Sequence, residues 1–206
     1  MWNRPDLQAV LVMLFLIGTF GLNFPIFIST MSATVFHAGA GQYGLLTSMM
    51  AVGSIAGALV AAGRAKPRIP LLLGAAAIFG FGCALAAITP NRLLFGLVLL
   101  IIGVSAQTFT ISTNSLVQLS TEPVMRGRVM AILLAVYLGG APIGAPIVGW
   151  VADRFGPRWA LGVGAAAGFA AAMVAIRYLA KSPAPRPVGG HAVEYGSEGL
   201  CELAHR

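Results

Sequence analysis

The feature that most constrains this chain is a long stretch without charge, because no Asp, Glu, Lys or Arg occurs between Leu7 and Gly63. A charged side chain at the centre of a membrane helix costs about 2.5 to 3.5 kcal/mol, so long charge-free runs separated by short charged connections indicate bilayer crossings. At a rise of about 1.5 Å per residue, this run is long enough to cross a hydrocarbon core of about 30 Å twice. The sequence therefore predicts an integral membrane protein.

The rest of the chain continues the same pattern. The first run divides at 37–42, where glycines separate two apolar stretches, and four further charge-free runs follow. Each is close to the length of about 17 to 25 residues that one spanning helix needs. We expect an all-α integral membrane fold whose bundle occupies residues 1–181, with six transmembrane helices at approximately 8–35, 43–62, 69–89, 93–119, 127–151 and 159–179. The Pro- and Gly-containing segment 182–206 is predicted to be a disordered cytoplasmic tail.

The basic residues predict the orientation of these helices. One side of the membrane receives most of them, namely Arg4, Arg64, Lys66, Arg68, Arg126, Arg128, Arg177, Lys181 and Arg186, and the other side receives Arg92, Arg154 and Arg158. Short cytoplasmic loops keep an excess of Lys and Arg, so we expect both termini in the cytoplasm of a multi-pass protein in the cell (inner) membrane. Arg126 and Arg128 then lie in a cytoplasmic loop and anchor the fifth helix. Because the charges are dispersed over loops, the net charge of +7 favours the lipid bilayer as partner and excludes nucleic acid.

Polar side chains follow one face of two of the predicted helices. In the first helix, Thr19, Asn23 and Phe27 share a face with Thr30 and Thr34, and in the fourth helix the corresponding residues are Gln107, Thr110, Asn114 and Gln118. Amides at membrane depth need partners or water, so both stripes are predicted to line a substrate cavity. The alternative is that they form hydrogen bonds between helices, at about 0.6 kcal/mol each.

The second and fifth helices are instead rich in small residues at four-residue spacing. Such spacing lets two helix backbones approach closely, and the prolines of the fifth helix favour bends. The predicted helix-packing residues are Gly53, Gly57, Gly140, Gly144, Pro142 and Pro146. The third and sixth helices are almost wholly apolar, as expected of spans that face lipid. In chain order the first three helices are polar, rich in small residues and apolar, and the next three helices repeat this order. The pattern predicts a 3+3 inverted repeat of the kind that builds one class of secondary transporters.

Three segments carry a resemblance to a known family. The segments 113–132 (TNSLVQLSTEPVMRGRVMAI), 138–150 (LGGAPIGAPIVGW) and 153–158 (DRFGPR) resemble the carboxy-terminal half of a major facilitator superfamily transporter, of the enterobactin-exporter or macrolide-efflux type. Residues 43–48 and 51–57 similarly resemble the eighth helix of that family. The resemblance implies half of a twelve-helix fold, in which the first and fourth helices line the cavity and the third and sixth are peripheral.

The resemblance implies efflux of a small-molecule or drug substrate by alternating access, and a chain that is not an enzyme. A separately encoded amino-terminal half is then the expected partner. Two alternatives stay open: a truncated remnant or assembly partner that does not transport, and a six-helix protein that is active only as a homodimer. We expect no catalytic residues, no cofactor and no metal, because the sequence contains no phosphate-binding loop, no nucleophile triad and no zinc-ligand spacing.

Overall fold

A computed structural model of the chain describes residues 5–37, 39–63, 68–121 and 125–181, and over these residues it contains helices and no strands. Six helical segments are long and apolar enough to cross a bilayer. They are Leu7–Val35, α3 (Ala40–Ala62), α4 (Ile69–Ile88), α5 (Arg92–Ser120), α6 (Arg126–Phe155) and α7 (Pro157–Lys181). The prediction of an all-α fold with six spans is confirmed. The predicted tail, 182–206, lies outside the described residues.

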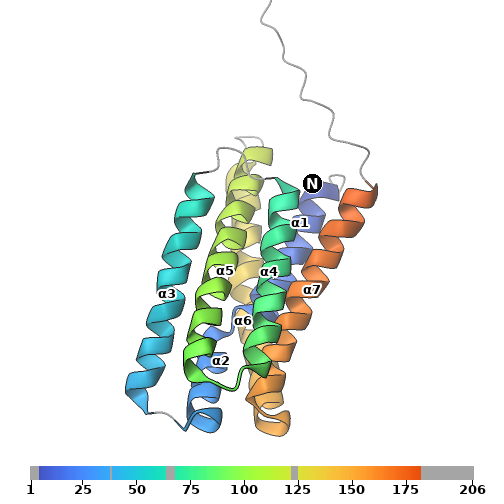
Figure 1. Ribbon diagram of the computed structural model, residues 1–206. Helices are drawn as coiled ribbons and strands as arrows, with labels where there is room; N and C mark the ends of the chain where they lie inside the picture. The colour runs from blue at the N-terminus through green and yellow to red at the C-terminus, as the bar shows by residue number, and fades with distance from the viewer. Residues whose placement is uncertain (1–4, 38, 64–67, 122–124, 182–206) are drawn as a thin grey trace, which may run out of the picture.

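The helices run alternately up and down the bundle. In Figure 1 the start of α1 (Pro5–Leu16), the end of α3, the end of α5 and the end of α7 all lie at the upper end. Because the connections alternate, Arg68, Arg126 and Lys181 lie at this end, and Arg92 and Arg158 lie at the other. The uneven distribution of basic residues that the sequence predicted therefore corresponds to the two ends of one bundle.

The first span is not one continuous α-helix. The α-helix α1 passes into a π-helical turn, η1 (Ile17–Gly21), and the helix is interrupted at Leu22 and Asn23. It resumes as α2 (Phe24–Thr30) and ends in a second π-helical turn, η2 (Met31–Val35). Pro25 explains the position of the break, since proline has no N–H to donate and its ring clashes with the preceding turn. The Leu22 N–H donates instead to the Ile17 carbonyl, five residues back, at 3.0 Å.

Glycines set the distance between the helix pair α3 and α5. A Cβ added at Gly53 would overlap the backbone at Leu100, and one at Gly57 would overlap the backbone at Val104. Across this contact the Thr108 hydroxyl donates to the Gly57 carbonyl at 3.2 Å. The two helix backbones therefore touch at these glycines.

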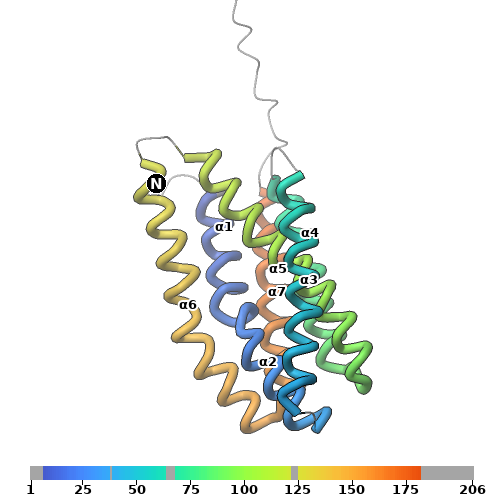
Figure 2. Tube along the Cα trace, turned by 90° about the vertical axis from the view of Figure 1, so that its left-hand side faces the viewer, coloured from blue at the N-terminus to red at the C-terminus, as the bar shows by residue number. Residues whose placement is uncertain are grey.

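A second close contact joins α6 to the first span. Added Cβ atoms at Gly140 and Gly144 would both overlap Thr19, in η1. The prolines Pro142 and Pro146 lie inside α6 with their side chains exposed. In Figure 2, α6 runs along the left-hand side of the bundle, next to the first span and away from α4.

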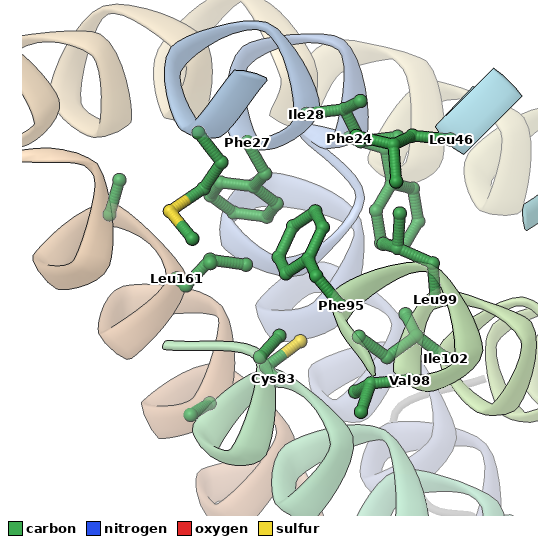
Figure 3. Close-up of a cluster of buried hydrophobic side chains, with 14 of the residues drawn as sticks. Phe24, Phe27, Ile28, Leu46, Cys83, Phe95, Val98, Leu99, Ile102 and Leu161 are labelled. Carbon is green, nitrogen blue, oxygen red and sulfur yellow. The ribbon is translucent and has the colours of Figure 1, made fainter. Parts of the chain in front are cut away.

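The interior of the bundle consists of two apolar clusters, one in each half of its height. The cluster nearer the lower end of Figure 1 includes Phe24, Phe27, Cys83, Phe95 and Leu161, which point toward one another in Figure 3. The other cluster includes Leu7, Leu72, Phe109, Val129 and Ala171. The apolar helices α4 and α7, which the sequence predicted to face lipid, bury one face against each other at Gly80 and Gly168. Next to this contact the exposed rings of Phe81 and Phe169 form an edge-to-face pair whose centres are 5.0 Å apart.

Candidate substrate cavity

The polar stripe of α5 lies where the bundle is only partly covered. Gln107, Thr110 and Asn114 are half-buried and Gln118 is exposed, whereas Phe109, Thr113 and Val117 on another face of the same helix are buried in the bundle. The helical repeat of about 3.6 residues puts the four polar residues on one face. They form a polar track along the half of α5 that ends at Ser120.

The amides of this track have no partners in the described part of the chain. The Thr110 hydroxyl donates to the Ala106 carbonyl within its own helix at 2.9 Å. The side chains of Gln107 and Asn114 make no hydrogen bond to any described residue. A primary amide held at membrane depth without a hydrogen bond costs several kcal/mol when it is dry. These two amides therefore need water or a further protein surface.

The polar stripe of the first span is placed differently. Thr19 and Asn23 are buried, and the Asn23 side-chain amide donates to the Thr19 carbonyl at 2.7 Å. This bond supplies a donor to a carbonyl beside the break in the helix, so Asn23 supports an interrupted backbone. The Thr19 hydroxyl lies against Gly140 of α6 and has no partner among the described residues.

Phe27, the third predicted cavity residue of this span, is fully buried in the aromatic cluster, with its ring centre 6.2 Å from that of Phe24. It packs against Gly164 of α7. The structure thus places Thr19, Asn23 and Phe27 in the interior and does not bring them to the half-buried face with Gln107 and Asn114. That they line a cavity stays a prediction.

Two helices of the bundle are poorly covered. Only 17% of the residues in the most apolar stretch of α3 and 22% in that of α6 are buried, against 44% to 56% in the other four spans. The glycine faces of α3 and α6 are used inside the bundle, against α5 and η1. Their opposite faces are left open, and these carry exposed apolar residues such as Ile55 and Leu138.

Charged and metal-binding side chains contribute little to the interior. Arg126 and Arg128 are exposed in the first turn of α6, and Asp153 is exposed in its last turn. No group of three or more His, Cys, Asp or Glu that is able to hold a metal ion lies within the described ranges. The sequence analysis did not single out Thr108, whose hydroxyl connects α5 to α3. Thr108 follows Ile101 by seven residues and Val104 by four, so helical spacing places it on the side of α5 that contacts the glycines of α3. This spacing could have identified it as a contact residue.

Comparison with known proteins decides the family. The family model of the Major Facilitator Superfamily matches residues 9–198. The chain belongs to this superfamily. It is therefore a multi-pass membrane protein whose six spans correspond to half of a major facilitator fold, and the family is one of transporters rather than enzymes, as the sequence predicted.

Among curated proteins, the chain is similar to the "Multidrug resistance protein B homolog" of two Mycobacterium tuberculosis strains, CDC 1551 / Oshkosh and ATCC 25618 / H37Rv. In both cases 29% of 126 aligned residues are identical, which covers 61% of this chain and 23% of the relative. The alignment thus spans less than a quarter of the length of these relatives. The predicted likeness to major facilitator drug exporters is confirmed by these matches.

Proposed function

We propose that this chain is the carboxy-terminal half of a secondary transporter that exports small molecules of the drug class by alternating access. The observation that carries the proposal is the pair of half-buried amides on α5, Gln107 and Asn114, which have no hydrogen-bond partner in the described bundle. Intramembrane polar groups without partners are typical of a solute pathway. With Thr110 and Gln118 they form one wall of the cavity, and the drug class follows from the printed names of the relatives.

The second wall comes from a partner that covers α3 and α6. Their open faces bear exposed apolar side chains, and alternating access requires two bundles that rock against each other around the substrate site. We propose a separately supplied amino-terminal half as this partner. A second copy of the chain and a remnant that transports nothing are the competing possibilities.

The coupling ion is expected to act outside these six spans. The described spans contain no buried Asp or Glu, and Asp153 is exposed at a helix end. A carboxylate that carries a proton through the membrane needs to face the bundle interior or a water-filled cavity. If transport is coupled to protons, we expect the titrating carboxylate in the partner half. The excess of basic residues at the upper end of Figure 1 supports a cytoplasmic location for both termini, in the inner membrane.

Reconstitution of transport tests the proposal. The full chain is placed in proteoliposomes with a separately expressed amino-terminal half of a major facilitator drug exporter, and efflux of a lipophilic cationic dye down an imposed gradient is recorded. We expect flux from the pair, and we expect the double variant Gln107→Leu/Asn114→Leu to lose at least tenfold of it. The control is Gln42→Leu in the first turn of α3, which removes an amide outside the α5 track and leaves the flux unchanged.

The other readings give different results in the same assay. Flux from the chain alone, together with a detergent-corrected mass of two chains, identifies the homodimer. Absence of flux in both formats from correctly inserted protein identifies a remnant and overturns the proposal. Equal flux from the wild type and the double variant overturns the assignment of the α5 track.

A further inference from the structure

A groove of about 680 Å³ lies between α3, α4 and α5, and it is separate from the polar track. On α5 it is lined by Ile101, Val104 and Thr108, which repeat at helical spacing along one face. Thr108 is about 100° around the helix from Gln107, so the groove and the polar track open on different sides of α5. Its volume is in the range of about 300 to 1,000 Å³ that is typical of ligand sites.

The walls of this groove suit an apolar occupant. Val60, Ile78 and Ile101 provide aliphatic side chains, and at Gly74 an added Cβ would meet nothing within 4 Å, so this part of the groove is open space. The two hydroxyl groups in the lining already have acceptors: Thr108 donates to the Gly57 carbonyl and Ser105 to the Ile102 carbonyl. The described part of the lining therefore offers no free hydroxyl donor to a polar solute.

Among the described residues of the lining, Arg68 is the one that carries a charge, and it lies at the N-terminal end of α4. Its side chain is exposed and has no ion pair with any described residue. The sequence adds Arg64 and Lys66 to the same connection between α3 and α4. A cation at the membrane surface above an apolar groove matches the shape of an anionic lipid.

The length of the groove corresponds to one leaflet. Ile78 lies ten positions after Arg68, which is a rise of about 15 Å along the helix axis and half of a hydrocarbon core of about 30 Å. We propose that this groove binds one anionic phospholipid, with an acyl chain along Gly74 and Ile78 and the headgroup phosphate at Arg68. Because lipid tails are already in an apolar medium, the contact with the phosphate gives the groove its preference. This site does not depend on the proposed transport function.

Photo-crosslinking tests the proposal on the full chain in nanodiscs of phosphatidylcholine. The probe is a trace of phospholipid with a photoreactive acyl chain, carrying either a phosphatidylglycerol or a phosphatidylcholine headgroup, and labelled peptides are identified by mass spectrometry. We expect peptides of α4 and α5 that line the groove to take up about five times more of the phosphatidylglycerol probe. At about 1.4 kcal/mol per tenfold this corresponds to about 1 kcal/mol, the value of one basic residue near an anionic surface.

Two pairs of variants complete the test. Arg68→Gln is expected to remove the preference for phosphatidylglycerol, whereas Arg92→Gln, at the other end of the bundle, keeps it. Gly74→Phe fills open space in the groove and is expected to lower labelling by both probes, whereas Gly162→Phe fills equally open space on α7 and does not. Four results would each overturn the proposal. The wild type takes up both probes equally, or Arg68→Gln keeps the preference for phosphatidylglycerol. Free inorganic phosphate suppresses the preference, or the groove is crosslinked to a second copy of the chain.

Discussion

This membrane bundle contains amide side chains of two kinds, those that are buried with a hydrogen-bond partner and those that are half-buried without one among the described residues. Asn23 is buried and bonded to the Thr19 carbonyl, so its amide belongs to the architecture of an interrupted helix. Gln107 and Asn114 are half-buried and unbonded within the described bundle, so their amides need water or a further protein surface. Identical chemistry thus has different consequences because the neighbouring helices differ.

This difference predicts opposite effects on stability. Asn23→Leu leaves the Thr19 carbonyl with one donor fewer in a buried position, and we expect a loss of about 1 to 2 kcal/mol, which is about 2 to 8 °C in Tm for a chain of this size. Gln107→Leu removes no hydrogen bond, so its Tm is expected to equal or exceed that of the wild type. Thermal unfolding in detergent, followed by circular dichroism, measures both. An equal fall in Tm for the two variants contradicts the assignment.

At the scale of whole helices, glycines determine which faces touch. In α6 the residues Gly140 and Gly144 admit the backbone of η1 at Thr19, and in α3 the residues Gly53 and Gly57 admit the backbone of α5. Both glycine pairs therefore form contacts inside the six-helix bundle. Any motion of α3 and α6 against a partner therefore uses the opposite faces of these helices, which the bundle leaves open.

Gly144→Ala tests the contact between α6 and the first span. The added Cβ overlaps the Thr19 carbonyl, so we expect the overpacking cost of about 1 to 3 kcal/mol and a lower Tm. The matched control is Gly149→Ala on the same helix, where an added Cβ meets nothing within 4 Å and the better helix propensity of alanine is expected to maintain or raise Tm. A Gly144→Ala protein as stable as Gly149→Ala would mean that the two helices are farther apart than described.

The number of helices and their approximate limits could be predicted from the sequence, because charge-free runs directly reflect the thickness of the hydrocarbon core. The interruption of the first span could be predicted only in part. Pro25 indicates a bend, but the π-helical turns and the bond from Asn23 to Thr19 depend on where α6 crosses. Helical spacing identified the polar faces. Helical spacing could not indicate which neighbouring helices cover each face. From the sequence alone, the buried amide of Asn23 could therefore not be distinguished from the half-buried amide of Asn114.

For the molecule as a whole, the uneven burial of the helices is the main result. Four spans are about half covered, whereas α3 and α6 are largely bare. A hydrophobic span is stable when it faces lipid, so the bare faces do not by themselves require a partner. The unbonded amides of α5 need water or a further protein surface. This uneven coverage supports the proposal that a second bundle completes the cavity.

Obstruction of α6 tests this proposal. Gly139 is exposed on the side of α6 away from η1, and a Cβ there meets nothing within 4 Å. We expect Gly139→Trp to leave the chain folded and to abolish copurification with a co-expressed amino-terminal half, measured by affinity capture from detergent. Gly162→Trp, at equally open space on α7, is the control and should leave copurification intact. Capture of the partner by Gly139→Trp at the wild-type level contradicts docking on this face.

Access of water to the α5 track is the property that most directly distinguishes a substrate cavity from a dry helix contact. In a background with Cys83→Ala and Cys201→Ala, a single Asn114→Cys is reacted in membranes with a maleimide that does not cross lipid, in the complex with the amino-terminal half. Met173→Cys, on the outer face of α7, is the comparison. We expect the cysteine at position 114 to be labelled and substrate to slow its labelling, while the cysteine at position 173 stays unlabelled. If neither cysteine is labelled from either side of the membrane, the track is dry and does not line a cavity.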